Sequence, residues 1–178
     1  MEGLEMILVH GLELESFTTS GGLGTMCETY LGRVQELNYK TMRYPGHCEL
    51  MRFLLNELYL RDQRDLANKL LRNALPAVAE DVVFVHAAVE GQKDGRLSRE
   101  EFVRAYPAMQ LEGASWRAIS WTTAASLCAV VEMVADGALP AQGFIKQEDI
   151  PFDKFMATRN GAIYRNAESV AGGATFTA

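Results

Sequence analysis

The stretch from residue 81 to residue 109 constrains the fold of this 178-residue chain more than any other part of its sequence. Residues 83–88 read VFVHAA, in which two sets of side chains alternate with the two-residue period of a β-strand. The pair Asp94-Gly95 follows, and this pair is among the strongest signals for a tight turn between antiparallel strands. The sequence therefore predicts an antiparallel hairpin over residues 81–109.

Helical spacing of apolar residues is found in five other segments. These segments are residues 2–12, 47–60, 61–76, 116–135 and 150–158. We expect Asp65 to cap the helix that Pro76 ends, and Asp136-Gly137 to close the helix over residues 116–135. The helix over residues 116–135 is apolar on most sides, so we expect it deep in the core or in a subunit interface.

Strands complete the predicted fold. Alternation predicts a strand over residues 12–18 and a longer one over residues 32–44, which Pro45-Gly46 ends. Because helices and strands do not alternate strictly, we predict an α+β domain with a mixed, largely antiparallel sheet covered by helices, and no complete Rossmann domain. This domain is expected over residues 1–165, and the small, polar residues 166–178 are expected to form a frayed tail.

The charge and the cysteines argue against several functions. A net charge of −6 opposes general binding to nucleic acid, which needs a basic face. The three cysteines form no CxxC pair, so we expect neither a disulfide framework nor a metal site, and reduced thiols indicate a cytoplasmic protein. The acidic N-terminus does not resemble a signal peptide, and no apolar run reaches the roughly 20 residues that cross a membrane.

The loop SGGLG, residues 20–24, is the first candidate for a binding element. Glycines after a strand can let the backbone approach a phosphate. The dinucleotide-binding pattern requires a third glycine, however, and Gly22-Leu23-Gly24 is followed by Thr25, Met26 and Cys27. The pattern alone therefore favours a plain connection between a strand and the next segment.

RYPGH, residues 43–47, is the second candidate. Arg43 has the geometry to hold a carboxylate with two hydrogen bonds, and Tyr44 could donate another. His47, at the start of a helix, suits proton transfer or hydrogen bonding. The alternative is an ordinary turn with a solvated arginine and a histidine that caps a helix.

Two further cations are candidates. Arg159, beside the pair Asn160-Gly161, could bind an anion, although such an arginine is more often simply exposed. Lys40 precedes Arg43 by three residues, so in a strand the two side chains are expected on opposite faces.

Three segments resemble the second domain of the saccharopine dehydrogenase family. They are TTSGGLG at residues 18–24, YKTMRYPGH at residues 39–47 and DIPFDKFMATRNGAIYR at residues 149–165. The resemblance covers residues 2–165, and the nearest branch is that of the lysine 6-dehydrogenase-like enzymes. The first two segments are the more specific ones.

This resemblance implies an NAD(P)-dependent oxidoreductase that acts on the CH–NH group of lysine or saccharopine. It implies that Arg43 and Arg159 bind the substrate carboxylate, and that His47 or Lys40 accepts a proton with Tyr44 as its orienting partner. Gly21 and Gly22 would let the backbone approach the substrate. The domain that binds NAD or NADP in this family has no counterpart in the chain, which is expected to form a homodimer.

Two other readings stay open at this point. One is a dimerisation or ligand-binding module without catalytic activity that lacks its nucleotide domain. The other is a reductive condensing enzyme of polyamine synthesis from the same family. The sequence does not choose among these substrates, nor between NAD and NADP.

Overall fold

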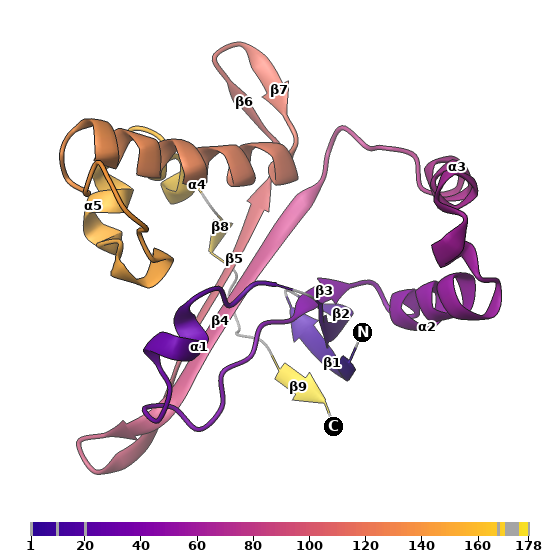
Figure 1. The fold of residues 1–178 in the computed structure, drawn as a ribbon, viewed down its shortest axis with the longest axis horizontal. Helices are drawn as coiled ribbons and strands as arrows, with labels where there is room; N and C mark the ends of the chain where they lie inside the picture. The colour runs from indigo at the N-terminus through magenta and orange to yellow at the C-terminus, as the bar shows by residue number, and fades with distance from the viewer. Residues whose placement is uncertain (1, 10, 20, 167, 170–174, 178) are drawn as a thin grey trace. The chain divides into compact units, whose positions relative to one another are not determined.

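The computed structural model describes residues 2–9, 11–19, 21–166, 168–169 and 175–177 (Figure 1). The chain divides into two units. Unit 1 consists of Met1–Gly22, Asn38–Val78 and Ala174–Ala178, and unit 2 consists of Leu23–Leu37 and Ala79–Gly173. Every strand pairing among the described residues is antiparallel, so the chain combines small antiparallel sheets with helices, which agrees with the predicted α+β class.

The sheet of unit 1 has the strand order β3-β2-β1-β9. Its strands are β1 (Glu2–Val9), β2 (Leu12–Thr18), β3 (Thr41–Arg43) and β9 (Thr175–Thr177). The strand predicted over residues 12–18 is confirmed. The helix predicted over residues 2–12 is wrong, because β1 pairs with β2 from Glu2 opposite Thr18 to Val9 opposite Leu12. Ile7 and Val9 are buried and Leu8 is exposed, so burial follows the period of a strand.

The long strand predicted over residues 32–44 is mostly wrong. Only β3 forms, because Thr41, Met42 and Arg43 pair with residues 15–17 of β2. Residues 33–40 are not assigned to any strand. Alternation in the sequence was therefore not sufficient for a strand where no neighbouring strand supplies the ladder.

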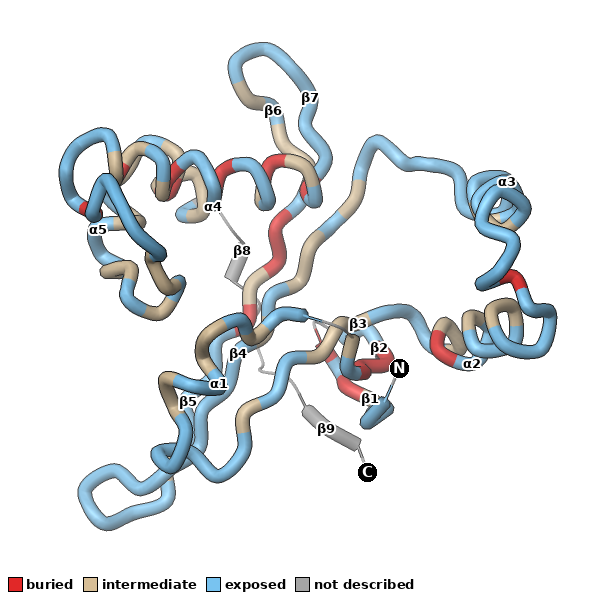
Figure 2. The backbone as a smooth tube through the Cα atoms, viewed as in Figure 1, coloured by how far each residue is buried: buried red, intermediate tan, exposed pale blue. Residues whose placement is uncertain are grey.

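The helices of unit 1 lie where the sequence predicts them. They are α2 (His47–Arg52), a π-helix η1 (Phe53–Glu57), a 3₁₀ helix η2 (Leu60–Asp62) and α3 (Arg64–Ala74). The expected cap is wrong: the N-cap of α3 is Gln63, and Asp65 lies in the first turn. An acid in that turn still interacts favourably with the helix dipole. Figure 2 shows no buried residue along α3.

The hairpin predicted over residues 81–109 is confirmed in unit 2. Strands β4 (Val82–Lys93) and β5 (Arg96–Pro107) pair along their full length, and Asp94-Gly95 forms the turn. Both turn residues have positive φ, 53° and 72°, as a type I′ turn requires. A second hairpin, β6 (Met109–Leu111) and β7 (Ala114–Trp116), was not predicted.

The expected frayed tail is described only in part. Strand β8 (Glu168–Ser169) pairs with β5, and β9 pairs with β1. The prediction for residues 167, 170–174 and 178 lies outside the described residues.

Unit 2 contains the two helices that the sequence predicts for this part of the chain. These two are α4 (Ala118–Ala135) and α5 (Phe152–Ala157). The other helices are α1 (Met26–Thr29) and the 3₁₀ helices η3 (Gln147–Asp149) and η4 (Gly161–Asn166). Helix α4 ends at Ala135, with Asp136 as its C-cap and Gly137 at φ 70°, as expected.

An aromatic cluster forms the core of unit 2. The ring of Tyr106 meets Trp121 edge to face at 5.7 Å and Tyr164 at 5.6 Å. The Trp121 Nε1–H donates to the carbonyl of Pro107 at 2.9 Å, and the Tyr164 hydroxyl donates to the carbonyl of Thr122. Both polar tips are therefore satisfied while the rings pack, which fixes α4 against β5 and η4.

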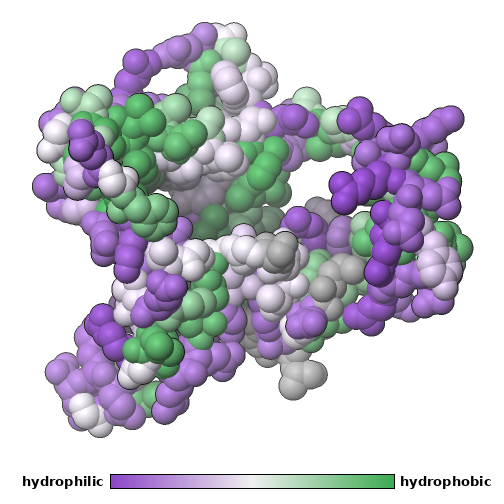
Figure 3. Space-filling model, viewed as in Figure 1, coloured by the Kyte–Doolittle hydropathy of each residue, from purple (hydrophilic) through white to green (hydrophobic). Residues whose placement is uncertain are grey.

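Only one side of α4 is covered. Its buried residues are Ala118, Trp121, Ala125, Ala129 and Met133. Ile119, Leu127 and Val131 are exposed, and apolar side chains gather over this part of the molecule in Figure 3. Among the described helices, α4 is the one with the length and apolar composition to cross a membrane, a criterion that the core helices of globular proteins also meet.

Candidate functional site

Strands β2 and β3 lead into two of the three segments that the sequence analysis singles out, residues 18–24 and 39–47. Glu15, Ser16 and Phe17 of β2 lie opposite Arg43, Met42 and Thr41 of β3. The glycine loop leaves the end of β2, and RYPGH leaves the end of β3. Strands β2 and β3, Gly21, Gly22 and the whole of RYPGH belong to unit 1, and a ladder of backbone hydrogen bonds joins the two strands.

The glycine loop closes on an aromatic ring of the second segment. Gly22 has φ 101°, and a Cβ atom at this position would overlap the ring of Tyr39. A side chain is therefore excluded twice, by the backbone conformation and by the ring. Gly21 has φ 85° and no heavy atom within 4 Å of its Cβ position. Of the two predicted glycines, Gly21 has free space at its Cβ position, whereas Gly22 packs against the Tyr39 ring.

A buried carboxylate holds the RYPGH turn. Gly46 is the N-cap of α2, and a glycine has no side chain to cap the helix. The carboxylate of Glu15, 4% exposed, takes this role: it accepts hydrogen bonds from the Gly46 N–H at 2.9 Å and from the Cys48 N–H. These donors at the start of α2 are therefore already used, so an external carboxylate or phosphate would have to displace Glu15.

His47 packs against Phe17, which lies on the same face of β2 as Glu15. Its ring is stacked on Phe17, with the centroids 6.0 Å apart and 16° between the planes. Its backbone N–H donates to the Tyr44 carbonyl at 3.3 Å, which closes the turn. His47 is half-buried, whereas Tyr44 is 70% exposed.

Arg43 faces the solvent beside this turn. Its Nη1 atom donates to the Met42 carbonyl at 2.7 Å. Within the described part of the chain, no carboxylate forms an ion pair with the Arg43 guanidinium. Arg43 lies opposite Glu15, so both side chains leave the same face of the sheet. Phe17, two residues further along β2, shares this face and brings His47 to it.

Lys40 belongs to the opposite face, as its spacing from Arg43 predicts. Its Nζ atom lies 2.7 Å from Oε2 of Glu5, and Glu5 pairs with Ser16, whose side chain leaves the other side of β2 from Glu15. The sheet therefore separates Lys40 from Arg43 and His47. The ammonium of Lys40 is also held by a carboxylate of the chain.

Arg159 belongs to unit 2, whereas Arg43 belongs to unit 1. Its side chain is 80% exposed and forms an ion pair with Glu112. Its backbone N–H donates to Glu132 at 2.8 Å, and the Asn160 side chain donates to the same carboxylate. Glu132 of α4 thus fixes the loop that follows α5, and the guanidinium of Arg159 is paired at the surface.

Unit 2 contains two further polar groups of residues. The carboxylate of Glu148 accepts hydrogen bonds from the hydroxyls of Thr25 at 2.9 Å and Thr29 at 2.5 Å. The bond from Thr29 is the main reason why the pKa of Glu148 is lowered from its ordinary value of about 4.5. These contacts tie α1 to η3.

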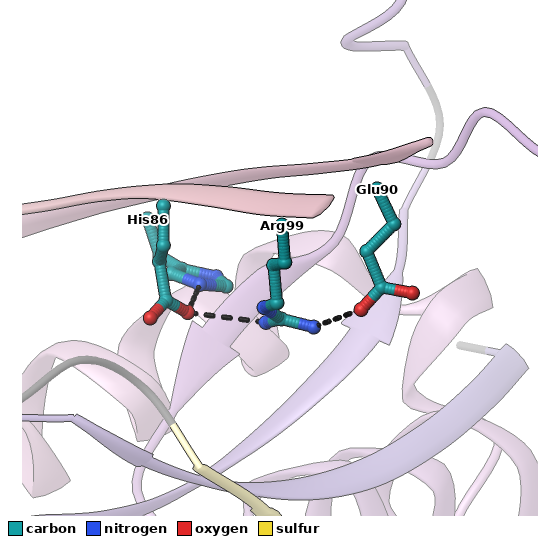
Figure 4. A network of polar contacts seen from close by, with 4 residues as sticks. His86, Glu90 and Arg99 are labelled. Carbon is teal, nitrogen blue, oxygen red and sulfur yellow. Dashed lines mark hydrogen bonds and ion pairs between the residues drawn. The ribbon is translucent and has the colours of Figure 1, made fainter. Parts of the chain in front are cut away.

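The second polar group lies on the hairpin (Figure 4). His86 Nε2 lies 2.7 Å from Glu101 Oε1, and Arg99 contacts both Glu101 at 3.1 Å and Glu90 at 2.6 Å. These residues come from the two paired strands β4 and β5, so the network joins them across one face of the hairpin.

Neither polar group forms a metal site. Among the described residues, no group of three histidine, cysteine or acidic side chains could hold a metal ion. Two open surface hollows lie elsewhere, and none of the predicted site residues lines either one. The first is lined by Lys93, Asp94, Arg96, Leu97 and Ser98 at the hairpin turn, and the second by residues 61–66.

Sequence reasoning missed Glu15 and Phe17, the residues that fix RYPGH. A weak signal exists in LELESFT, where Glu15 and Phe17 are two positions apart and therefore lie on the same face of the strand. No known family model matches the sequence, and no solved structure matches the chain.

Proposed function

We propose that the chain is the substrate-binding part of an NAD(P)-dependent oxidoreductase that acts on the CH–NH group of lysine or saccharopine. The observation that carries the proposal is the exposed guanidinium of Arg43, which has no carboxylate partner in the described part of the chain and shares a sheet face with His47. The family resemblance of residues 18–24 and 39–47 supplies the reaction class.

Arg43 is the carboxylate-binding group in this proposal. A guanidinium offers five N–H donors in a planar fork, and its bond to the Met42 carbonyl leaves most of them available. Arg159, the other predicted carboxylate ligand, belongs to unit 2 and is paired with Glu112, so the carboxylate-binding role in this proposal rests on Arg43 alone.

His47 is the proton acceptor in this proposal. Lys40, the other candidate, belongs to the opposite face and is paired with Glu5, whereas the His47 ring lies on the face of Arg43. A base must lie within hydrogen-bond reach of the proton that it accepts, so a substrate held by Arg43 favours His47. Tyr44, exposed beside both, is the orienting hydrogen-bond donor.

The glycine loop lacks the features of a dinucleotide-binding loop. The glycine loop lacks the third glycine, and its Gly22 is closed by the Tyr39 ring, so the backbone cannot approach a pyrophosphate there. The nucleotide therefore belongs to another domain in this proposal. The residues of this chain bind the amino acid, orient it and take its proton.

A cytoplasmic homodimer is part of the same proposal. The exposed apolar side chains Ile119, Leu127 and Val131 of α4 support it, because such a surface is unusual for a helix that faces only water. The same observation favours the second candidate function, a dimerisation module without catalytic activity.

The test is oxidation of L-lysine and of saccharopine by the chain with a nucleotide domain of the family supplied. Wild type, Arg43→Ala and Arg72→Ala are compared, because Arg72 is an exposed arginine of the same unit on α3. Turnover that Arg43→Ala weakens and Arg72→Ala does not is the expected result. Turnover that is equal in all three would remove Arg43 from the site.

A further inference from the structure

We propose that Glu15 and Phe17 of strand β2 are positioning residues that fix Arg43 and His47 on one face of the sheet of unit 1. The inference rests on the proposed function for its catalytic meaning. Its geometric content concerns only this chain and is tested without turnover.

Glu15 is a carboxylate in a place where a charge is costly. It is 4% exposed, and a buried carboxylate is tolerated only where hydrogen bonds compensate for the lost water. Here the compensation comes from the N–H groups of Gly46 and Cys48 at the start of α2. The position of Glu15 and the position of the turn therefore depend on each other.

The same residue holds both ends of the RYPGH turn. At the front end, the backbone of Glu15 lies opposite Arg43 in the β2–β3 ladder. At the back end, its side chain binds Gly46 and Cys48, which flank His47. The path of the chain from Arg43 to Cys48 is thus fixed by one residue that is about 30 positions away in the sequence.

Phe17 fixes the histidine ring itself. Side chains two positions apart on a strand leave the same face, so Phe17 follows Glu15 on the side of α2. Its buried ring lies nearly parallel to the His47 ring and offset from it, with the centroids 6.0 Å apart. A ring held in this way keeps its orientation, whereas a free histidine would turn about its side-chain bonds.

The variants follow from these contacts. Glu15→Gln keeps the size of the side chain but replaces one carboxylate oxygen with an amide group that cannot accept, so one of the two backbone donors loses its acceptor. Phe17→Leu keeps an apolar side chain but removes the ring. Glu13→Gln is the matched control, because Glu13 is an exposed acid on the same face of β2.

The first measurement is the proton NMR spectrum of the His47 ring in the full chain, assigned with a His47→Gln variant. Protons above an aromatic ring resonate upfield, so we expect upfield signals in wild type and Glu13→Gln. In Phe17→Leu and Glu15→Gln they should move toward the values of a free histidine. Amide spectra of the same samples show whether each variant is folded. Unchanged His47 signals in folded Glu15→Gln and Phe17→Leu would overturn the proposal.

If Glu15→Gln does not fold, Glu15→Asp provides the second test. The carboxylate is kept but is one methylene shorter, so it reaches less far toward Gly46 and Cys48. A shift of the His47 signals in this folded variant supports the positioning role, and unchanged signals overturn it.

The second measurement separates this inference from the proposed function. With a nucleotide domain supplied, we expect Glu15→Gln to lower kcat about tenfold, because one of the backbone contacts on either side of His47 is lost while the pairing of Arg43 with β2 is kept. Phe17→Leu should likewise lower kcat, because it acts on the His47 ring. If wild type shows no turnover, the proposed function fails and the NMR result alone decides the positioning role. If wild type turns over and both variants match it, the positioning role fails.

Discussion

At the scale of single residues, carboxylates join segments that are distant in this chain. Glu15 binds the start of α2, and Glu132 binds the loop that follows α5. Asp81 binds the start of α4, and Glu148 binds α1. Several acids of a chain with a net charge of −6 thus serve as internal hydrogen-bond acceptors.

Arg43→Ala is expected to raise the substrate KM by about tenfold to a hundredfold, which corresponds to the 1.5–3 kcal/mol typical of hydrogen bonds to charged groups. Steady-state kinetics at varied L-lysine concentration measure the effect, and Arg72→Ala should leave KM unchanged. An unchanged KM in Arg43→Ala would show that Arg43 does not bind the substrate.

Thr29→Val is expected to raise the pKa of Glu148 toward its ordinary value, because the Thr29 hydroxyl is the main cause of its lowering. Carbon-detected NMR titration of the Glu148 side chain measures this. A lowered pKa in the folded state stabilises the fold above the unfolded value of about 4.5, and this stability is lost as the pH falls through the folded value.

The pH dependence of stability provides a second test of the Thr29→Val variant. Thr29→Val should therefore be less stable than wild type at neutral pH and should approach it in acid. Thr123→Val is the control, because the Thr123 hydroxyl donates to the Ile119 carbonyl within α4. An unaltered Glu148 titration in Thr29→Val would contradict the assignment.

At the scale of elements, the start of α4 depends on a residue outside the helix. The N-cap, Arg117, makes no side-chain cap, and the carboxylate of Asp81 accepts the N–H groups of Ala118 and Ile119 instead. Asp81 directly precedes β4, so it joins the hairpin to the helix that packs on it.

Asp81→Ala is therefore expected to lower the free energy of unfolding by about 1 kcal/mol, within the 0.5–2 kcal/mol of lost helix caps. Urea denaturation followed by tryptophan fluorescence reports on this change, because Trp121 lies in α4. Glu80→Ala, at the neighbouring exposed acid, is the control. Equal stability of the two variants would mean that the contact with α4 does not stabilise the fold.

Elements with strong local signals could be predicted from the sequence. The β4–β5 hairpin has its Asp94-Gly95 turn, and α4 has its long apolar run and closing Gly137. Residues 2–12 carry apolar spacing that fits a helix, but pairing with β2 decides in favour of a strand. Residues 33–40 alternate, yet the structure assigns none of them to a strand.

The candidate site was predictable to the same extent. Arg43, Tyr44 and His47 are adjacent in the sequence, so their grouping is a local property. The separation of Lys40 from them follows from strand alternation and was also expected. Glu15 and Phe17 were missed because their contacts with the turn arise only when β2 pairs with β3.

At the scale of the whole molecule, the apolar residues that α4 leaves exposed are the basis of the proposed homodimer. Leu127→Arg is expected to convert a dimer into monomers, because it introduces a charge on the exposed apolar side of the helix. Sedimentation velocity measures the mass, and Leu97→Arg, at an exposed leucine of the hairpin, is the control. A Leu127→Arg variant that stays dimeric would exclude this face of α4 as the interface.

The proposed function makes this chain the substrate half of an amino-acid dehydrogenase. Formation of NAD(P)H is measured for the purified chain with L-lysine or saccharopine, alone and with a separately expressed nucleotide domain of the saccharopine dehydrogenase family. We expect NAD(P)H to form only when the nucleotide domain is added. If a folded, dimeric chain gives no NAD(P)H in either case, the proposed function is wrong and a binding or assembly module is favoured.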